Sequence, residues 1–236
     1  MDEFLSPNTT ETTVALKKGI FHVGEKRYKQ MKVILVNGSS HEDGCTHTAL
    51  CEVASAIQAE GIETEIFWVG SKELSGCLDC GNCNDLHGNC IFAKRAEEFI
   101  EAAKTADGFV FGSPVHYDAA AKNMVSFMNR VFYSSARDTF YLKPAAAIIT
   151  ARSGGTTATL KQLHEYCFTA QMPIIPSKYW NMIHGMSSEQ IKQNVEAMKN
   201  MRNLGKNIAW FLKCKEAGEK ADILTPREAK KAALNK

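Results

Sequence analysis

From residue 31 onward, short apolar runs alternate with longer segments whose apolar residues recur at helical spacing. Continuous apolar runs are typical of strands buried on both faces, whereas apolar residues at i, i+3, i+4 and i+7 are typical of helices packed on such strands. Five strands alternating with five helices predict a doubly wound parallel α/β sheet with helices on both faces. We expect strands at residues 32–37, 63–69, 108–112, 144–150 and 173–175, and helices at 46–60, 95–105, 119–132, 156–169 and 188–215.

Length and composition narrow the class of protein. The 236 residues suit one α/β domain at 31–223, preceded by a polar extension at 1–30 and followed by a frayed Ala/Lys-rich tail at 224–236. A net charge of +2 does not favour a nucleic-acid partner. We expect no membrane span and no signal peptide, and therefore a cytoplasmic protein. Eight cysteines in such a protein suggest thiols or metal ligands before disulfides.

Three segments that would leave the carboxyl ends of strands have unusual chemistry. They cover residues 38–46, 113–117 and 150–156, and loops at these positions converge on the ligand crevice of a doubly wound sheet. The first segment gathers hydroxyls and backbone amides at a helix start, which favours an anion such as phosphate. Each loop alone is also explained by ordinary helix capping and turn chemistry, so their joint placement is the stronger observation.

These segments resemble the NADPH-dependent FMN reductase family. Residues 38–46 (GSSHEDGCT) are similar to the family's phosphate loop GSxRxxGxT, and residues 113–117 (SPVHY) to its SPxYY-type loop. Residues 127–130 (FMNR) are similar to its F-x-D-R motif, where we expect Arg130 to be structural and to close its helix through a nearby carbonyl or acid. The resemblance implies a flavodoxin-like, five-stranded parallel sheet of order 2-1-3-4-5 that binds FMN at the crevice.

The resemblance also implies which residues hold FMN. The phosphate would lie near Ser39, His41, Cys45 and Thr46. The ring would lie near Pro114, Val115, His116, Tyr117, Arg152, Ser153, Gly154 and Gly155. His41 stands where the family often has Arg, so the phosphate would lack a bidentate partner. We expect no essential acid or base, because the flavin carries the chemistry, and treat His116 and Tyr117 as candidate substrate contacts.

Four cysteines lie close together in the sequence, at Cys77, Cys80, Cys83 and Cys90. Thiolates at this density suit a soft metal or an iron–sulfur cluster, and the first three match the ferredoxin-type C-x2-C-x2-C run. The fourth comes too late for that pattern. Zinc remains an alternative, as do bare thiols at a subunit interface. Within the resembled family, the compact spacing is similar to that of the iron–sulfur flavoproteins, which implies a [4Fe–4S] cluster beside FMN.

The resemblance implies an FMN-dependent NAD(P)H oxidoreductase that passes electrons to a small acceptor, such as a quinone, a flavin, a nitro or azo compound, or an enone. It also implies a homodimer or homotetramer. The first alternative is an iron–sulfur flavoprotein that carries electrons between a ferredoxin-like donor and an acceptor. The second is a non-redox regulatory protein whose cysteines hold zinc or sense oxidants, and this alternative predicts a colourless protein.

Overall fold

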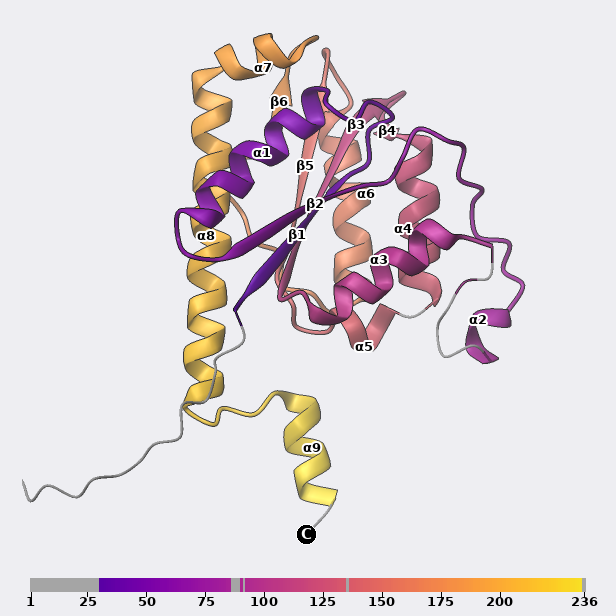
Figure 1. Ribbon diagram of the computed structural model, residues 1–236, viewed down its shortest axis with the longest axis vertical. Coiled ribbons are helices and arrows are strands. Elements are labelled where there is room, and N and C mark those ends of the chain that lie inside the picture. Colours follow the sequence, from indigo (N-terminus) through magenta and orange to yellow (C-terminus); the bar gives the residue numbers. More distant parts are fainter. Residues whose placement is uncertain (1–29, 86–89, 91, 135, 235–236) are drawn as a thin grey trace, which may run out of the picture.

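The computed structural model describes residues 30–85, 90, 92–134 and 136–234, and its centre is a parallel sheet (Figure 1). Five parallel strands lie in the order β2-β1-β3-β5-β6. Their bounds are Lys32–Asn37 (β1), Glu63–Trp68 (β2), Gly108–His116 (β3), Ala145–Ala151 (β5) and Met182–His184 (β6). The short strand β4 (Ala119–Ala120) pairs only with β3, so the five parallel strands confirm the predicted order 2-1-3-4-5.

The sheet is covered on both faces because its inner strands β1, β3 and β5 are largely apolar on both faces. Ile34 and Val36 of β1 face one core, whereas Val33 and Leu35 face the other. The first core is closed by α3 (Lys94–Thr105), α4 (Lys122–Ser134), α5 (Ala136–Phe140) and α6 (Thr156–Thr169). The second is closed by α1 (Cys45–Gln58), α7 (Ser188–Gln193) and α8 (Val195–Lys220). Figure 1 shows these helices on opposite sides of the sheet.

The strand register aligns the carboxyl ends of three strands. Asn37, the last residue of β1, is level with Trp68 of β2 and Gly112 of β3. Pro114 of β3 is level with Thr150 of β5. The chain segments that follow β1, β3 and β5 therefore leave the sheet at one edge.

Two predicted elements at the end of the domain are wrong in detail. The fifth strand is Met182–His184 and not residues 173–175, where Ile174 makes only an isolated bridge to Ala145. The predicted helix at 188–215 is two helices, α7 and α8. They are separated at Asn194, whose side chain accepts a 3.1 Å hydrogen bond from the Ala197 amide and so starts α8.

The tail is not frayed, in contrast to the prediction. It contains α9 (Pro226–Leu234), which begins after Thr225. The Thr225 amide donates to Glu228 Oε2 at 2.8 Å, and the Glu228 amide donates to Thr225 Oγ1 at 3.4 Å, which is a reciprocal capping box. The predicted extension falls almost wholly on residues 1–29, which lie outside the described residues. Among the helices that the structure describes, none has the length and apolarity to cross a bilayer.

Two glycines of α8 provide a matched test of helix packing. A Cβ at Gly205 would lie 2.6 Å from the Val53 carbonyl oxygen of α1, whereas a Cβ at Gly218 would meet nothing closer than 3.8 Å. We expect Gly205→Ala to lower the free energy of unfolding by about 1–3 kcal/mol, because α8 must move off α1. Gly218→Ala should raise it by roughly 0.5–1 kcal/mol through helix propensity. Urea denaturation of both variants checks this, and equal effects would contradict the close packing.

Candidate functional site

Asn37 organises the loop after β1. Its side chain is fully buried, accepts a 3.1 Å hydrogen bond from the Ser39 amide and donates a 2.9 Å bond to the Glu42 carbonyl. The Ser39 hydroxyl in turn accepts from the His41 amide at 3.1 Å. The Trp68 indole donates to the Ser39 carbonyl at 2.8 Å. These bonds hold residues 38–44 in one curled conformation, a role for Asn37 that the sequence interpretation missed.

The curled loop leads into an uncapped helix. The N-cap of α1 is Gly44, and no side chain caps the first turn. The N-terminal amides and the helix dipole therefore favour an anion at this point. Of the four predicted phosphate residues, His41 is exposed, Cys45 is half-buried at the first position of the helix, and Ser39 and Thr46 are buried. Burial raises the pKa of the Cys45 thiol, so this side chain is neutral at physiological pH.

The sequence interpretation treated residues 113–117 as a loop, but the structure shows that they are part of a hairpin. β3 continues to His116 and folds back on β4 through a two-residue turn, in which Val115 pairs with Ala120 and His116 with Ala119. The turn residues Tyr117 and Asp118 both have positive φ, at 50° and 58°. This is the geometry of a type I′ hairpin turn, which non-glycine residues rarely adopt. The Tyr117 side chain at the tip is fully exposed.

The third predicted segment, after β5, meets the other two. The Thr46 hydroxyl lies 2.9 Å from the Thr150 hydroxyl, which joins the start of α1 to the end of β5. Arg152, Ser153 and Gly154 are exposed, and Gly155, the N-cap of α6, has a φ of +83° and no side-chain cap.

The hairpin packs directly against this last loop. A Cβ at Gly155 would lie 2.5 Å from Asp118 Oδ1 and 2.7 Å from Val115 Cγ1. The structure thus brings all three segments together at the carboxyl edge of the sheet. That they bind FMN stays a prediction.

The contact at Gly155 gives a test of this arrangement. We expect Gly155→Ala to lower the free energy of unfolding by about 1–2 kcal/mol, because an alanine strains the left-handed backbone. Its Cβ also displaces the hairpin, so flavin affinity should fall together with stability. Urea denaturation and flavin titration measure the two effects. Gly61→Ala is the control, because Gly61 has a similar φ of +82° and a Cβ there meets nothing within 4 Å; an equal loss of flavin affinity in both variants would contradict the packing of the hairpin on Gly155.

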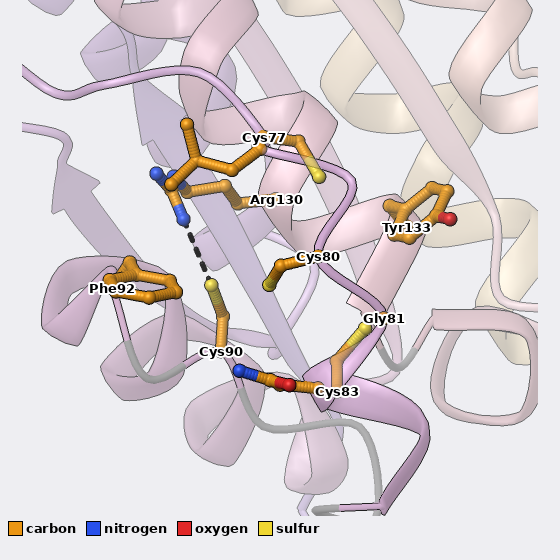
Figure 2. A pocket seen from close by; sticks show the side chains of 10 residues that line it. Cys77, Cys80, Gly81, Cys83, Cys90, Phe92, Arg130 and Tyr133 are labelled. Carbon is orange, nitrogen blue, oxygen red and sulfur yellow. Dashed lines mark hydrogen bonds between the residues drawn. The ribbon is translucent and has the colours of Figure 1, made fainter.

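The four clustered cysteines line a single pocket on the α4 side of the molecule (Figure 2). Cys77 and Cys80 are exposed, Cys90 is half-buried and Cys83 is buried. The Asp79 amide donates to Cys77 Sγ at 3.4 Å, and the positive φ values of Asp79 (50°) and Gly81 (75°) turn the chain around the sulfurs. The pocket also includes Leu78, Phe92, Arg130 and Tyr133.

Arg130 holds in place the segment at residues 75–83, here called the cysteine loop, which carries Cys77, Cys80 and Cys83. Its guanidinium donates to the Ser75 carbonyl at 2.6 Å, to the Gly76 carbonyl at 2.7 Å and to Cys90 Sγ at 3.0 Å. Arg130 is therefore structural, as predicted, and binds carbonyls. It does not close its own helix, however, because the carbonyls belong to the cysteine loop. The sequence interpretation missed this role, which no pattern in the FMNR motif indicates.

The four cysteines of this pocket are suited to binding a metal cation. Burial raises the pKa of the Cys83 thiol, and negative charge on Cys77, Cys90 and Cys80 raises it further, while its own backbone amide lowers it. Four thiolates that repel one another need a positive centre to be stable together. Among the described residues, no three His, Cys, Asp or Glu side chains are already gathered at metal-binding distances. The donor set fits a metal centre, but the sulfurs would have to draw closer around it.

Comparisons with known proteins agree with this architecture. An iron–sulfur flavoprotein of Methanocaldococcus jannaschii is 30% identical over 192 residues, which cover 78% of this chain and 98% of that protein. An iron–sulfur flavoprotein of Archaeoglobus fulgidus is 25% identical over 193 residues, 76% of this chain and 96% of that protein.

Solved structures show the same fold at low sequence identity. RosB, solved with 8-demethyl-8-formylriboflavin-5′-phosphate, aligns with a TM-score of 0.66 at 15% identity, over 87% of this chain and 86% of that one. An archaeal flavodoxin aligns with a TM-score of 0.52 at 15% identity, over 78% of this chain and 99% of that one. The sequence profile of the NADPH-dependent FMN reductases matches residues 31–187. The chain therefore belongs to the NADPH-dependent FMN reductase family.

Proposed function

We propose that the chain is an FMN-dependent oxidoreductase that takes electrons from NAD(P)H and passes them to a small acceptor. The observation that carries this proposal is the meeting of three loops at the carboxyl edge of the sheet, where α1 and α6 both begin without a side-chain cap. When bound, FMN supplies hydride and single-electron transfer, so the protein has to bind and orient it.

Each part of the edge has a distinct task in this proposal. The amides at the start of α1, with the Ser39 and Thr46 hydroxyls, bind the phosphate. The backbone at Gly154 lets the ring approach closely, because a Cβ position there is open, whereas Gly155 makes room for the hairpin that borders the ring. His116 and Tyr117 project from the hairpin and cover the ring, where they contact the acceptor.

Flavin titration and reduction test the proposal. The chain stripped of flavin should quench FMN fluorescence at one FMN per chain, with riboflavin bound at least tenfold more weakly because it lacks the phosphate. Anaerobic mixing with NADH and with NADPH should bleach the flavin absorbance without another protein. Failure to bind FMN would overturn the proposal, and binding without bleaching by either nucleotide would overturn the NAD(P)H step.

A specific observation also favours the iron–sulfur flavoprotein alternative. Four cysteines surround one pocket, and an arginine with no acidic partner among the described residues reaches one of their sulfurs. Two relatives align with this chain over nearly their whole length, and both are named iron–sulfur flavoproteins. We propose that Cys77, Cys80, Cys83 and Cys90 hold a [4Fe–4S] cluster, which supplies one-electron transfer when bound.

The donor distinguishes an enzyme with its own substrate from an electron carrier. If the chain is a carrier, reduced ferredoxin should bleach the flavin at least tenfold faster than NAD(P)H does under the same anaerobic conditions. The reverse order supports the oxidoreductase. Light scattering of the same preparation tests the further proposal that the chain forms a homodimer or homotetramer, and a monomeric mass would overturn it.

A further inference from the structure

Arg130 is the largest fully buried side chain of the described residues, with 2% of its surface exposed. It lies on α4 and lines the cysteine pocket, and among the described residues its hydrogen bonds go to Ser75, Gly76 and Cys90; Figure 2 shows the bond to Cys90. Besides the Ser75 and Gly76 carbonyls, it donates to the Ser75 hydroxyl at 2.7 Å and to Cys90 Sγ at 3.0 Å.

The charge of Arg130 has no carboxylate partner among the described side chains. By contrast, Arg95, Arg202 and Arg227 are each paired with an Asp or Glu side chain. Those pairs are partly exposed, where an ion pair contributes little. A buried guanidinium cannot lose its proton and is costly to bury without a counter-charge. Neutral carbonyls and a hydroxyl solvate the guanidinium, but they do not neutralise it.

Among the described residues, the cysteine pocket is the place that can provide this counter-charge. Arg130 donates a hydrogen bond to the sulfur of Cys90, and the other three cysteines line the same cavity. Four neutral thiols would leave the cation unbalanced. Four thiolates around an iron–sulfur cluster carry net negative charge, and that charge becomes larger on reduction.

We propose that Arg130 is the counter-ion of the four-cysteine centre, holding Cys90 in place through its N–H···S bond and raising the reduction potential of the cluster. The inference rests on the cluster of the proposed function. A positive charge stabilises the more negative, reduced form of a neighbouring centre, so its removal makes the centre harder to reduce. The charge and the hydrogen bond act together here, because the same delocalised guanidinium provides both.

Two substitutions separate the charge of Arg130 from its packing. Arg130→Gln removes the charge and keeps a polar side chain, whereas Arg130→Lys keeps the charge and loses the planar fork. Arg202→Gln is the control, because Arg202 of α8 forms a partly exposed ion pair with Glu52 of α1. The measurements are the iron and sulfide content after anaerobic reconstitution and the midpoint potential from a redox titration followed by EPR.

The Arg130→Gln variant should be reduced about tenfold less favourably than the wild type, a fall of about 59 mV for a one-electron couple. The Arg130→Lys variant should keep most of the wild-type potential, and Arg202→Gln all of it. Loss of iron from Arg130→Gln, with normal iron in Arg130→Lys and normal circular dichroism in both, would also support the proposal.

Two results would overturn the inference in distinguishable ways. A wild-type potential in a fully loaded Arg130→Gln protein, or equal iron loss from both Arg130 variants, would show that Arg130 only packs, while the proposed cluster would stand. A wild-type chain that takes up no iron and sulfide would overturn the cluster itself, and the counter-ion role with it.

Discussion

Replacing Cys83 with alanine is expected to reduce the iron content from about four atoms per chain to below about one, while FMN binding persists. Cys83 is the most buried of the four cysteines, so no water or exposed side chain replaces it easily as a ligand. It lines the same pocket as the other three cysteines. Iron and acid-labile sulfide assays after anaerobic reconstitution measure the loss, and flavin fluorescence measures the retained FMN.

Cys167→Ala is the matched control. Cys167 lies on the buried face of α6, where burial raises its pKa to about 12, so its thiol stays protonated and unsuited to a metal. We expect this variant to lose some stability and no iron. Full iron in Cys83→Ala, or equal iron loss from the two variants, would contradict ligation by the clustered cysteines.

The second large effect is expected from Asn37→Ala, which should weaken FMN binding by about tenfold to a hundredfold. The substitution leaves the Ser39 amide and the Glu42 carbonyl without their buried partner, and each unmade bond costs about 1–3 kcal/mol. The loop then loses the curled conformation that aims the amides of α1 at the phosphate. Isothermal titration with FMN measures the change.

Asn203→Ala on α8 controls for loss of an asparagine, and its FMN affinity should equal that of the wild type. Riboflavin provides a second control, because it lacks the phosphate. Its affinity should fall less than that of FMN in Asn37→Ala. An equal fall for both ligands would contradict a role for Asn37 in the phosphate loop.

The sequence predicted the central sheet well because the inner strands β1, β3 and β5 are largely apolar on both faces, a pattern typical of buried parallel strands. The elements at its margin were harder to predict. β6 is three residues long and follows an irregular segment, so the apolar run before it at Ile174 and Ile175 looked more like a strand. The sequence does contain capping signals for both helix starts, at Asn194 and at Thr225 with Glu228. Hydrophobic periodicity alone does not detect them.

The sequence predicted which three segments form the candidate site, but not their conformations or the contacts between them. Strand order placed the loops at one edge, whereas the hairpin at Tyr117 and Asp118 depends on left-handed backbone that non-glycine residues rarely signal. Asn37 was predicted only as the last residue of the strand at 32–37, and its bonds to the loop follow only from the folded chain. The contact between Arg130 and Cys90 joins residues forty positions apart, and no local pattern encodes it.

The most direct test of the whole account is to purify the chain without oxygen, record its visible spectrum, and assay flavin, iron and acid-labile sulfide per chain. We expect about one FMN, about four irons and about four sulfides per chain. FMN without iron would contradict the cluster and leave a simple flavin reductase. A colourless chain that takes up no FMN on reconstitution would contradict the central claim.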